Sequence, residues 1–292
     1  MIRVKEMGPR DGLQNEKQII SIEDRIKYIH LLEQAGLDYI EVGAFVRPDL
    51  IPQMAGTDAV IDGLDLQEHT EISVLVPNIK GFEQARNTGI KEIAVFTAAS
   101  ETFNQKNINA SIAESLQRFI EICKQADDLN IKVRGYVSTC FVCPFEGNIS
   151  PEQVIPVIEK LLEMGCYEVS IGDTIGKATL AQTRTLFEKT HHIGLNGWLA
   201  GHFHDTYGQA IDNIKTAMEW DVKTFDASSG GIGGCPYAPG APGNVGTEDV
   251  VQMLQKENIE NKVNLTALVK ASSFIEKKIG HRLASKVYQE EK

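Results

Sequence analysis

The pattern His-x-His at His202 and His204 is the strongest chemical signal in this chain of 292 residues. It ends an apolar run that predicts a strand over Trp198–Phe203. Side chains at positions i and i+2 of a strand lie on the same face, so both imidazoles would point into one space and could bind one metal ion. The pattern has a second interpretation, in which one histidine packs in the core and the other caps the turn that begins at Asp205.

Short apolar runs alternate with longer helical patterns, and this alternation predicts the elements that position the histidines. The predicted strands are Ile2–Met7, Leu37–Val42, Glu71–Val76, Lys91–Phe96, Lys132–Val137, Tyr167–Gly172, Trp198–Phe203 and Val222–Ala227. Eight strands that alternate with helices over about 250 residues indicate an α/β fold, the (β/α)8 TIM barrel. An open doubly wound sheet is disfavoured, because no Gly-x-Gly-x-x-Gly turn follows the first strand.

Capping signals mark several predicted helices and the end of the barrel. Ser21 and Ser111 each precede an acidic residue by three positions, as helix N-caps do. Pro156 could bend the helix in which it lies. Two helical stretches, Leu265–Ile279 and Arg282–Glu290, follow the last barrel helix. We therefore expect one catalytic domain over residues 1–292, with the barrel at about 1–257 and a short C-terminal helical extension at about 264–290.

Composition and charge exclude several classes of partner. The formal net charge is -11, so neither nucleic acid nor an anionic membrane is an expected partner. No apolar run approaches the roughly 20 residues that a membrane-spanning helix needs. The first predicted strand begins at Ile2, which leaves no room for a leader, so a cytoplasmic protein is expected.

The five cysteines favour reduced thiols over a disulfide framework, because their number is odd and the chain is long. Cys123 and Cys166 lie in apolar patterns and are expected to be buried. Cys140 and Cys143 resemble half a zinc knuckle or a redox pair, but no second pair accompanies them.

Polar residues collect where the predicted strands end, which is where TIM barrels carry their active sites. Asp11 follows the first strand, and Asn244 lies in a glycine-rich loop, Gly230–Gly246, after the eighth. With the two histidines they form a mixed nitrogen and oxygen ligand set that suits octahedral Mg²⁺ or Mn²⁺. Zinc is the alternative metal, with Cys235 as a ligand. Asp11 has a second interpretation, as an ordinary turn residue before Gly12.

Four further residues have chemistry that suits such a site. Arg10 could stabilise an oxyanion or enolate beside a metal, or simply form a salt bridge with Glu41 or Asp173. Glu41 and Asp173 are candidates for proton transfer or for orienting their neighbours. Cys235 is predicted to have a chemical role and not a structural one, because its glycine-rich loop is an improbable place for a core residue. The length of that loop suits a lid that excludes water.

Four segments carry a resemblance to a known family. They are GPRDGLQNE (Gly8–Glu16), GDTIG (Gly172–Gly176), HFHDTYGQA (His202–Ala210) and GGIGGCPYAPGAPGN (Gly230–Asn244). They resemble the 3-hydroxy-3-methylglutaryl-CoA lyase family of barrel metallolyases, over nearly the whole chain, and the cysteine loop is the specific part. The resemblance implies cleavage of 3-hydroxy-3-methylglutaryl-CoA to acetyl-CoA and acetoacetate, a step of leucine degradation and ketone-body formation.

The resemblance also implies roles for individual residues. Its implied ligands of the divalent cation, Mg²⁺ or Mn²⁺, are Asp11, His202, His204 and Asn244. Its implied catalytic residues are Arg10, Glu41, Asp173, His202 and Cys235. Residues 98–109 resemble the segment of the family that faces the acyl-CoA, and within it Asn107 is expected to bind the acyl-CoA.

Two other functions stay open from the sequence. A synthase would join acetyl-CoA to a 2-oxo acid, but such synthases usually carry further domains after the barrel. A barrel that only binds acyl-CoA or metal would be expected to lack one of the site residues, and none is missing. The C-terminal helices suggest a homodimer interface.

Overall fold

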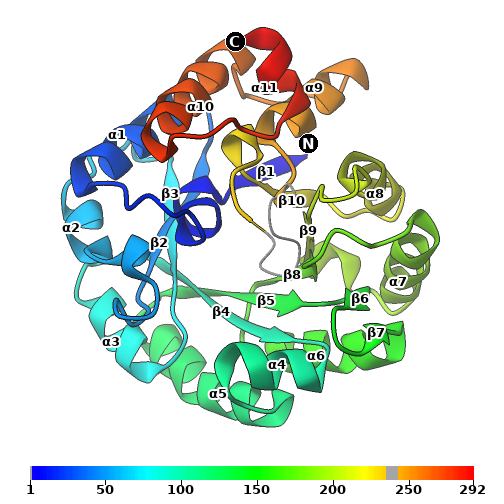
Figure 1. Cartoon of the computed structure of the whole chain (residues 1–292). Coiled ribbons are helices and arrows are strands. Elements are labelled where there is room, and N and C mark those ends of the chain that lie inside the picture. The colour runs from blue at the N-terminus through cyan, green and yellow to red at the C-terminus, as the bar shows by residue number, and fades with distance from the viewer. Residues whose placement is uncertain (1, 235–242) are drawn as a thin grey trace.

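A closed barrel of parallel strands forms the centre of the computed structural model, which describes residues 2–234 and 243–292 (Figure 1). Around the barrel the strands follow the order β1-β10-β9-β8-β5-β4-β3-β2. Their bounds are β1 (Arg3–Glu6), β2 (Tyr39–Ala44), β3 (Glu71–Leu75), β4 (Glu92–Ala98), β5 (Lys132–Ser138), β8 (Glu168–Asp173), β9 (Leu199–Phe203) and β10 (Thr224–Ala227). Every one of them overlaps a predicted strand, so the predicted TIM barrel is confirmed.

The strands are buried on both faces, as strands of a parallel sheet covered by helices should be. All six residues of β2 are buried, for example. Because successive side chains point to opposite faces, a register shift of one residue would exchange the interior and exterior sets.

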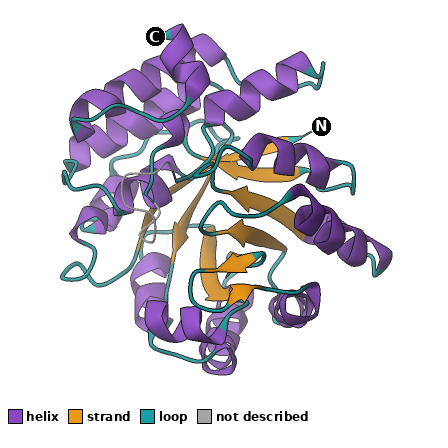
Figure 2. Cartoon of the chain, turned by 45° about the vertical axis from the view of Figure 1, so that its right-hand side comes forward, coloured by secondary structure: helices purple, strands orange, loops and turns teal. Residues whose placement is uncertain are grey.

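Helices surround the barrel, as Figure 2 shows. Their bounds are α1 (Ile22–Gln34), α2 (Thr57–Asp62), α3 (Ile79–Arg86), α4 (Glu101–Ile108), α5 (Ile112–Asp128), α6 (Pro151–Glu163), α7 (Leu180–His192), α8 (Ala210–Met218), α9 (Thr247–Lys256), α10 (Leu265–Ile279) and α11 (Lys286–Glu291). The predicted caps form: the Ser21 hydroxyl accepts from the Asp24 amide at 3.2 Å, and Ser111 and Glu114 form a capping box. Of the described helices, none has the length and hydrophobicity to cross a bilayer.

The structure differs from the predicted elements at a few places. The predicted helix Arg282–Glu290 is wrong at its start, because α11 begins at Lys286 after the cap residue Ser285. The segment before it packs against Gly230 instead, and the Ala284 amide donates to the Gly230 carbonyl at 3.0 Å. Pro156 lies inside α6 without ending it. A short hairpin, β6 (Val142–Cys143) and β7 (Gly147–Asn148), was not predicted.

The four described cysteines are free and buried, as expected for Cys123 and Cys166. Cys140 and Cys143 contact different partners: the Cys140 thiol donates to the Val137 carbonyl at 3.0 Å, and the Cys143 thiol pairs with the Ser100 hydroxyl at 3.0 Å. The prediction for Cys235 falls outside the described residues.

Candidate active site

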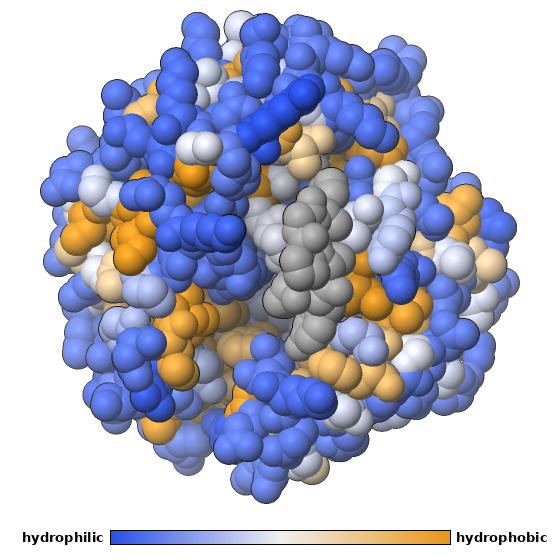
Figure 3. All heavy atoms as spheres, viewed as in Figure 1, coloured by the Kyte–Doolittle hydropathy of each residue, from blue (hydrophilic) through white to orange (hydrophobic). Residues whose placement is uncertain are grey.

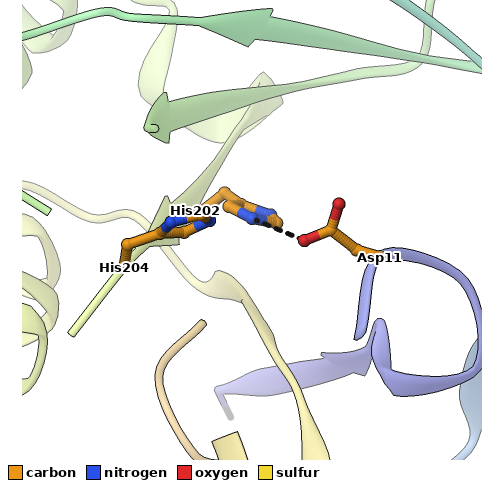
Figure 4. Close-up of side chains that lie close together, drawn as sticks. All are labelled: Asp11, His202 and His204. Carbon is orange, nitrogen blue, oxygen red and sulfur yellow. Dashed lines mark ion pairs between the residues drawn. The ribbon is translucent and has the colours of Figure 1, made fainter. Parts of the chain in front are cut away.

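Asp11, His202 and His204 converge at the carboxyl ends of the strands (Figure 4). One potential ligand atom from each residue lies within 4.8 Å of the others. His202 Nε2 is 3.8 Å from Asp11 Oδ2, and the two imidazole centroids are 5.5 Å apart. The expectation that the two histidines share one space is confirmed, and Asp11 joins them from a different element.

A tight turn directly after β1 carries Asp11. Gly8–Gly12 forms a single π-helical turn, in which the Gly12 amide donates to the Met7 carbonyl at 3.1 Å. A Cβ atom at Gly12 would lie 2.5 Å from the side chain of Ile232, so only glycine allows this turn to pack against the start of the glycine-rich segment. The turn thus fixes Asp11 relative to the end of β10.

His202 is oriented from behind by Asp226 of β10. Its Nδ1 lies 3.1 Å from Asp226 Oδ2, and this contact leaves Nε2 facing Asp11. Burial lowers the pKa of His202, but the hydrogen bond and charge of Asp226 outweigh it and raise the pKa overall. A carboxylate behind an imidazole is the usual second partner of a metal-binding histidine.

Arg134 and Ser170 hold Asp226 in place. Arg134 Nη2 donates to Asp226 Oδ1 at 2.8 Å, and the Ser170 hydroxyl donates to Oδ2 at 2.7 Å. The sequence analysis missed Asp226. A signal was present, because an acidic residue in the middle of a buried strand needs a partner inside the barrel.

His204 has a buried nitrogen with no partner among the described residues, its Nδ1. Burial first, and then the charge of His202, lower the pKa of His204 to about 4. The imidazole is therefore neutral near pH 7, which is the form that binds metal. A buried, unsatisfied imidazole nitrogen beside a carboxylate and a second imidazole fits a divalent cation.

Asn244 reaches the same place from the far end of the glycine-rich loop. It forms an antiparallel bridge with His204, and its Nδ2 donates to Asp11 Oδ2 at 2.7 Å. The predicted ligand atom was the amide oxygen, whereas the nitrogen faces Asp11 in this structure. A half-turn of the amide exchanges the two atoms, because they are almost the same size.

Arg10 is buried between two carboxylates. Its Nη1 donates to Asp11 Oδ1 at 2.6 Å, and its Nε donates to Glu41 Oε2. Burial alone would raise the pKa of Asp11, but Arg10 and the histidines lower it to about 2, so Asp11 is ionised near pH 7. Burial likewise raises the pKa of Glu41, although Arg10 opposes this. The expected salt bridge of Arg10 with Glu41 is thus present.

Asp173 is buried at the end of β8 and holds a loop. Its Oδ1 and Oδ2 accept from the backbone amides of Lys177 and Ala178, each at 3.0 Å. Burial raises the pKa of Asp173 to about 6, against the lowering effect of these hydrogen bonds. None of its described contacts reaches Arg10, so the alternative pair of the sequence analysis is not formed in the described part of the chain.

A cavity of about 300 Å³ opens in front of these residues. Its polar side includes Arg10, Asp11, His202, His204 and, from α4, Asn107. Glu41 and Asp173 are buried and do not line the cavity. The cavity can therefore hold an anionic or oxygen-rich ligand against a metal-type donor set and a permanent cation.

The fold and this donor set define a TIM-barrel enzyme with a candidate divalent-cation site at the mouth of the barrel. The family model described as HMGL-like matches residues 1–275. The chain is 48% identical over 274 residues to the 3-hydroxy-3-isohexenylglutaryl-CoA/hydroxy-methylglutaryl-CoA lyase of Pseudomonas aeruginosa, which covers 94% of this chain and 91% of the relative. The chain therefore belongs to the hydroxymethylglutaryl-CoA lyase family.

Solved structures of lyases agree with this assignment. The hydroxymethylglutaryl-CoA lyase from Pseudomonas aeruginosa superposes with a TM-score of 0.97 at 48% identity and covers 99% of this chain and 96% of its own. An HMG-CoA lyase from Acinetobacter baumannii, solved in complex with coenzyme A and 3-methylmalate, has a TM-score of 0.94 at 34% identity, over 99% of this chain and 94% of that one.

Proposed function

We propose that this protein is a divalent-metal-dependent carbon-carbon lyase that cleaves 3-hydroxy-3-methylglutaryl-CoA to acetyl-CoA and acetoacetate. The observation that carries the proposal is the convergence of Asp11, His202 and His204 beside the buried Arg10, in a chain of the hydroxymethylglutaryl-CoA lyase family. The reaction needs a base for the C3 hydroxyl, and it needs a cationic group where the thioester enolate forms.

The metal site would consist of Asp11, His202, His204 and Asn244. A divalent cation bound there would lower the pKa of the C3 hydroxyl of the substrate. The ionised Asp11 and the neutral His204 offer one oxygen and one nitrogen ligand without losing a proton first. We favour Mg²⁺ or Mn²⁺ because the described donors are oxygen and imidazole nitrogen. Zinc would be favoured if Cys235 joined them.

Arg10 would stabilise the product side of the bond cleavage. When the C2–C3 bond breaks, its electron pair moves to the thioester and C3 becomes the ketone of acetoacetate. The guanidinium lines the cavity, and Glu41 and Asp11 fix its orientation before any substrate binds. We assign Glu41 to the positioning of Arg10, because it is fully buried behind the cavity wall.

The remaining predicted residues divide between proton transfer and positioning. We propose that Cys235 moves the protons between the hydroxyl and C2. His202 would take part in catalysis through the metal that it binds, because its Nδ1 contacts Asp226 and its Nε2 faces the metal site. We assign Asp173 a positioning role, because both of its oxygens are bound to backbone amides. Asn107 lines the cavity from α4 and would contact the thioester arm of the acyl-CoA. The coenzyme A in the Acinetobacter structure supports an acyl-CoA substrate.

Three further properties belong to the proposal. We propose a role in leucine degradation and ketone-body formation, a cytoplasmic location, and a homodimer formed through the C-terminal helices. Light scattering tests the dimer, and a monomer mass would refute it.

The decisive experiment is a cleavage assay. Purified protein with 3-hydroxy-3-methylglutaryl-CoA should release acetoacetate with Mg²⁺ or Mn²⁺, and chelator should stop the reaction. Cys235→Ala should lower the rate strongly, while Cys123→Ala, which changes a buried thiol outside the cavity, serves as the matched control. If no acetoacetate forms with either metal, the proposed lyase activity is refuted.

A further inference from the structure

Two elements at the mouth of the barrel interrupt the regular alternation of strands and helices. One is α4, which lies between β4 and α5, and the other is the hairpin of β6 and β7 between β5 and α6. The face of the molecule seen in Figure 1 is hollowed at its centre, and both polar and apolar surface border the hollow (Figure 3). The proposed mechanism uses α4, through Asn107, but it gives the hairpin no role.

The helix α4 presents one face to the cavity. Phe103 and Asn107 are four positions apart, so they lie on the same side of the helix, and both line the cavity. The Ser100 hydroxyl caps the helix by accepting from the Phe103 amide at 3.1 Å. With only eight residues, α4 depends on contacts with the rest of the molecule for its stability and position.

The turn of the hairpin supplies such contacts along α4. Glu146 Oε1 accepts from the Thr102 amide at 2.6 Å, at the amino end of the helix, where a carboxylate is favourable. The Phe145 and Phe103 rings have centroids 6.4 Å apart. Lys106 Nζ lies 4.2 Å from the centroid of the Phe145 ring. The hairpin therefore contacts both the first and the second turn of α4.

The hairpin is itself fixed to the barrel. The Cys143 thiol pairs with the Ser100 hydroxyl at 3.0 Å, and the Ile149 amide donates to the Phe141 carbonyl at 2.9 Å. Gly147 has a φ of 77°, which a glycine adopts without strain, so the chain can reverse there. The hairpin can thus hold α4 in place before any ligand binds.

The strand order indicates which part of the substrate reaches α4, and this step rests on the proposed function. The strand β4, which leads into α4, is three strands away from β9, which carries His202. The metal site would hold the acyl end of the substrate near β9. The part that extends from there to α4 is the thioester arm with the coenzyme beyond it.

We propose that the hairpin positions α4 for binding the coenzyme arm of the substrate, with Phe145 and Glu146 as its positioning residues. Neither side chain lines the cavity, so both act through α4. The coenzyme arm stays the same while the C2–C3 bond breaks. Loss of a positioning residue should therefore weaken the binding of substrate and transition state alike, which raises KM and leaves kcat unchanged.

The test compares 3-hydroxy-3-methylglutaryl-CoA with the N-acetylcysteamine thioester of the same acid, which lacks most of the coenzyme arm. Phe145→Ala should raise KM for the CoA thioester about tenfold and change kcat by less than about twofold. The ratio of kcat/KM for the CoA thioester to that for the short thioester should fall about tenfold. Glu146→Ala should lower this ratio more weakly, and Phe145→Tyr, which keeps the ring, should retain it.

The controls separate this inference from the proposed function. Trp198→Ala removes an aromatic side chain that is 54% exposed and outside the cavity. Glu152→Ala removes a carboxylate from the first turn of α6, which does not line the cavity. Both should leave the ratio unchanged. If the unaltered protein cleaves neither thioester, the proposed function fails. If it cleaves the CoA thioester and Phe145→Ala has the same ratio, this inference alone is overturned.

Equal losses for the two thioesters would also overturn it, because the hairpin would then act on the acyl end or on the whole site. If the short thioester reacts too slowly to measure, the separation of KM from kcat decides, and a loss confined to kcat overturns the inference. Thermal unfolding verifies that each variant is folded. If Phe145→Ala does not fold, the values measured for Glu146→Ala decide.

Discussion

The interior of the barrel holds buried charges in two regions that differ in how they are paired. Near the amino ends of the strands, Lys5 bonds to Glu168 at 2.7 Å, and Arg134 bonds to Glu168 at 2.7 Å. At the carboxyl ends, the buried Nδ1 of His204 has no described partner, and His202 lies 3.8 Å from Asp11, too far for a hydrogen bond. Arg10 is also paired at the carboxyl ends, but the imidazole of His204 keeps a buried nitrogen without a described partner, and we interpret this nitrogen as part of a ligand site.

The paired region should carry the largest effect on stability. Arg134→Met leaves Asp226 and Glu168 as buried carboxylates without their main cation, and such losses cost about 3–5 kcal/mol. Urea unfolding should therefore show a free energy of unfolding lowered by that amount. Arg184→Met is the matched control, because Arg184 forms a long, solvent-exposed ion pair with Glu219 at 3.6 Å. Loss of that pair should lower the free energy of unfolding by less than about 1 kcal/mol. Similar losses in both variants would remove the distinction between the two regions.

The unsatisfied region should carry the largest effect on activity. His204→Ala removes a proposed metal ligand that has no described hydrogen bond at Nδ1. We expect acetoacetate production to fall by more than about 100-fold, beyond what loss of an outer partner costs. The thermal unfolding temperature should change little without metal, but the rise caused by added Mn²⁺ should disappear. His192→Ala, at an exposed histidine, should retain both properties. A large loss of stability in metal-free His204→Ala would show that His204 is structural.

Asp226 connects the two regions and should show an intermediate effect on both. It accepts from Arg134 on one side and contacts His202 Nδ1 on the other. Asp226→Asn keeps the shape but weakens the orientation of His202, so metal affinity should fall by about 10–100-fold. Metal titration measures this affinity. If Asp226 had a purely structural role, the metal affinity of the variant would be unchanged. Ser170→Ala removes one hydrogen bond to the same carboxylate and should act in the same direction but more weakly.

The sequence predicted those features that depend only on residues close to one another along the chain. Apolar runs and helix caps involve only a few neighbouring residues, so they can be recognised in the sequence alone. The strands and most of the helices predicted from them are confirmed. The shared position of His202 and His204 follows from the two-residue period of a strand. The start of α11 was predicted wrongly, because hydrogen bonds to Gly230 hold the residues before it in a non-helical path.

The sequence could not predict partners that only the closed barrel brings together. Arg10 could have paired with Glu41 or with Asp173. The strand order decides, because β2 is next to β1 whereas β8 is three strands away. Asp226 and Arg134 are 92 positions apart, and no local pattern links them. The long-range contacts that orient a site thus depend on barrel closure and register.

A third group of buried carboxyl groups is hydrogen-bonded without any cation, and it should give the smallest effect. Glu248 accepts from the Gly230 amide at 2.7 Å and from the Ser272 hydroxyl, and Glu6 accepts from the Ser229 amide at 2.9 Å. Both carboxylates hold segments that flank the glycine-rich loop. Burial raises the pKa of Glu248 to about 8 and that of Glu6 to about 7, although their hydrogen bonds oppose the shift.

These raised pKa values make the protein less stable as pH increases. A carboxyl group with a folded-state pKa above its unfolded value binds more protons in the folded state, so its stabilising contribution is complete below about pH 4.5 and is lost as pH rises through about 8. Between pH 6 and pH 7 we expect the free energy of unfolding to fall by up to about 1.4 kcal/mol through Glu248. Glu248→Gln cannot ionise and should flatten this part of the pH profile, whereas Glu83→Gln, at an exposed position, should not. An unchanged slope in Glu248→Gln would mean that the carboxylate of Glu248 is better solvated than its burial indicates, and that neutral donors alone can stabilise a carboxylate between α9 and α10.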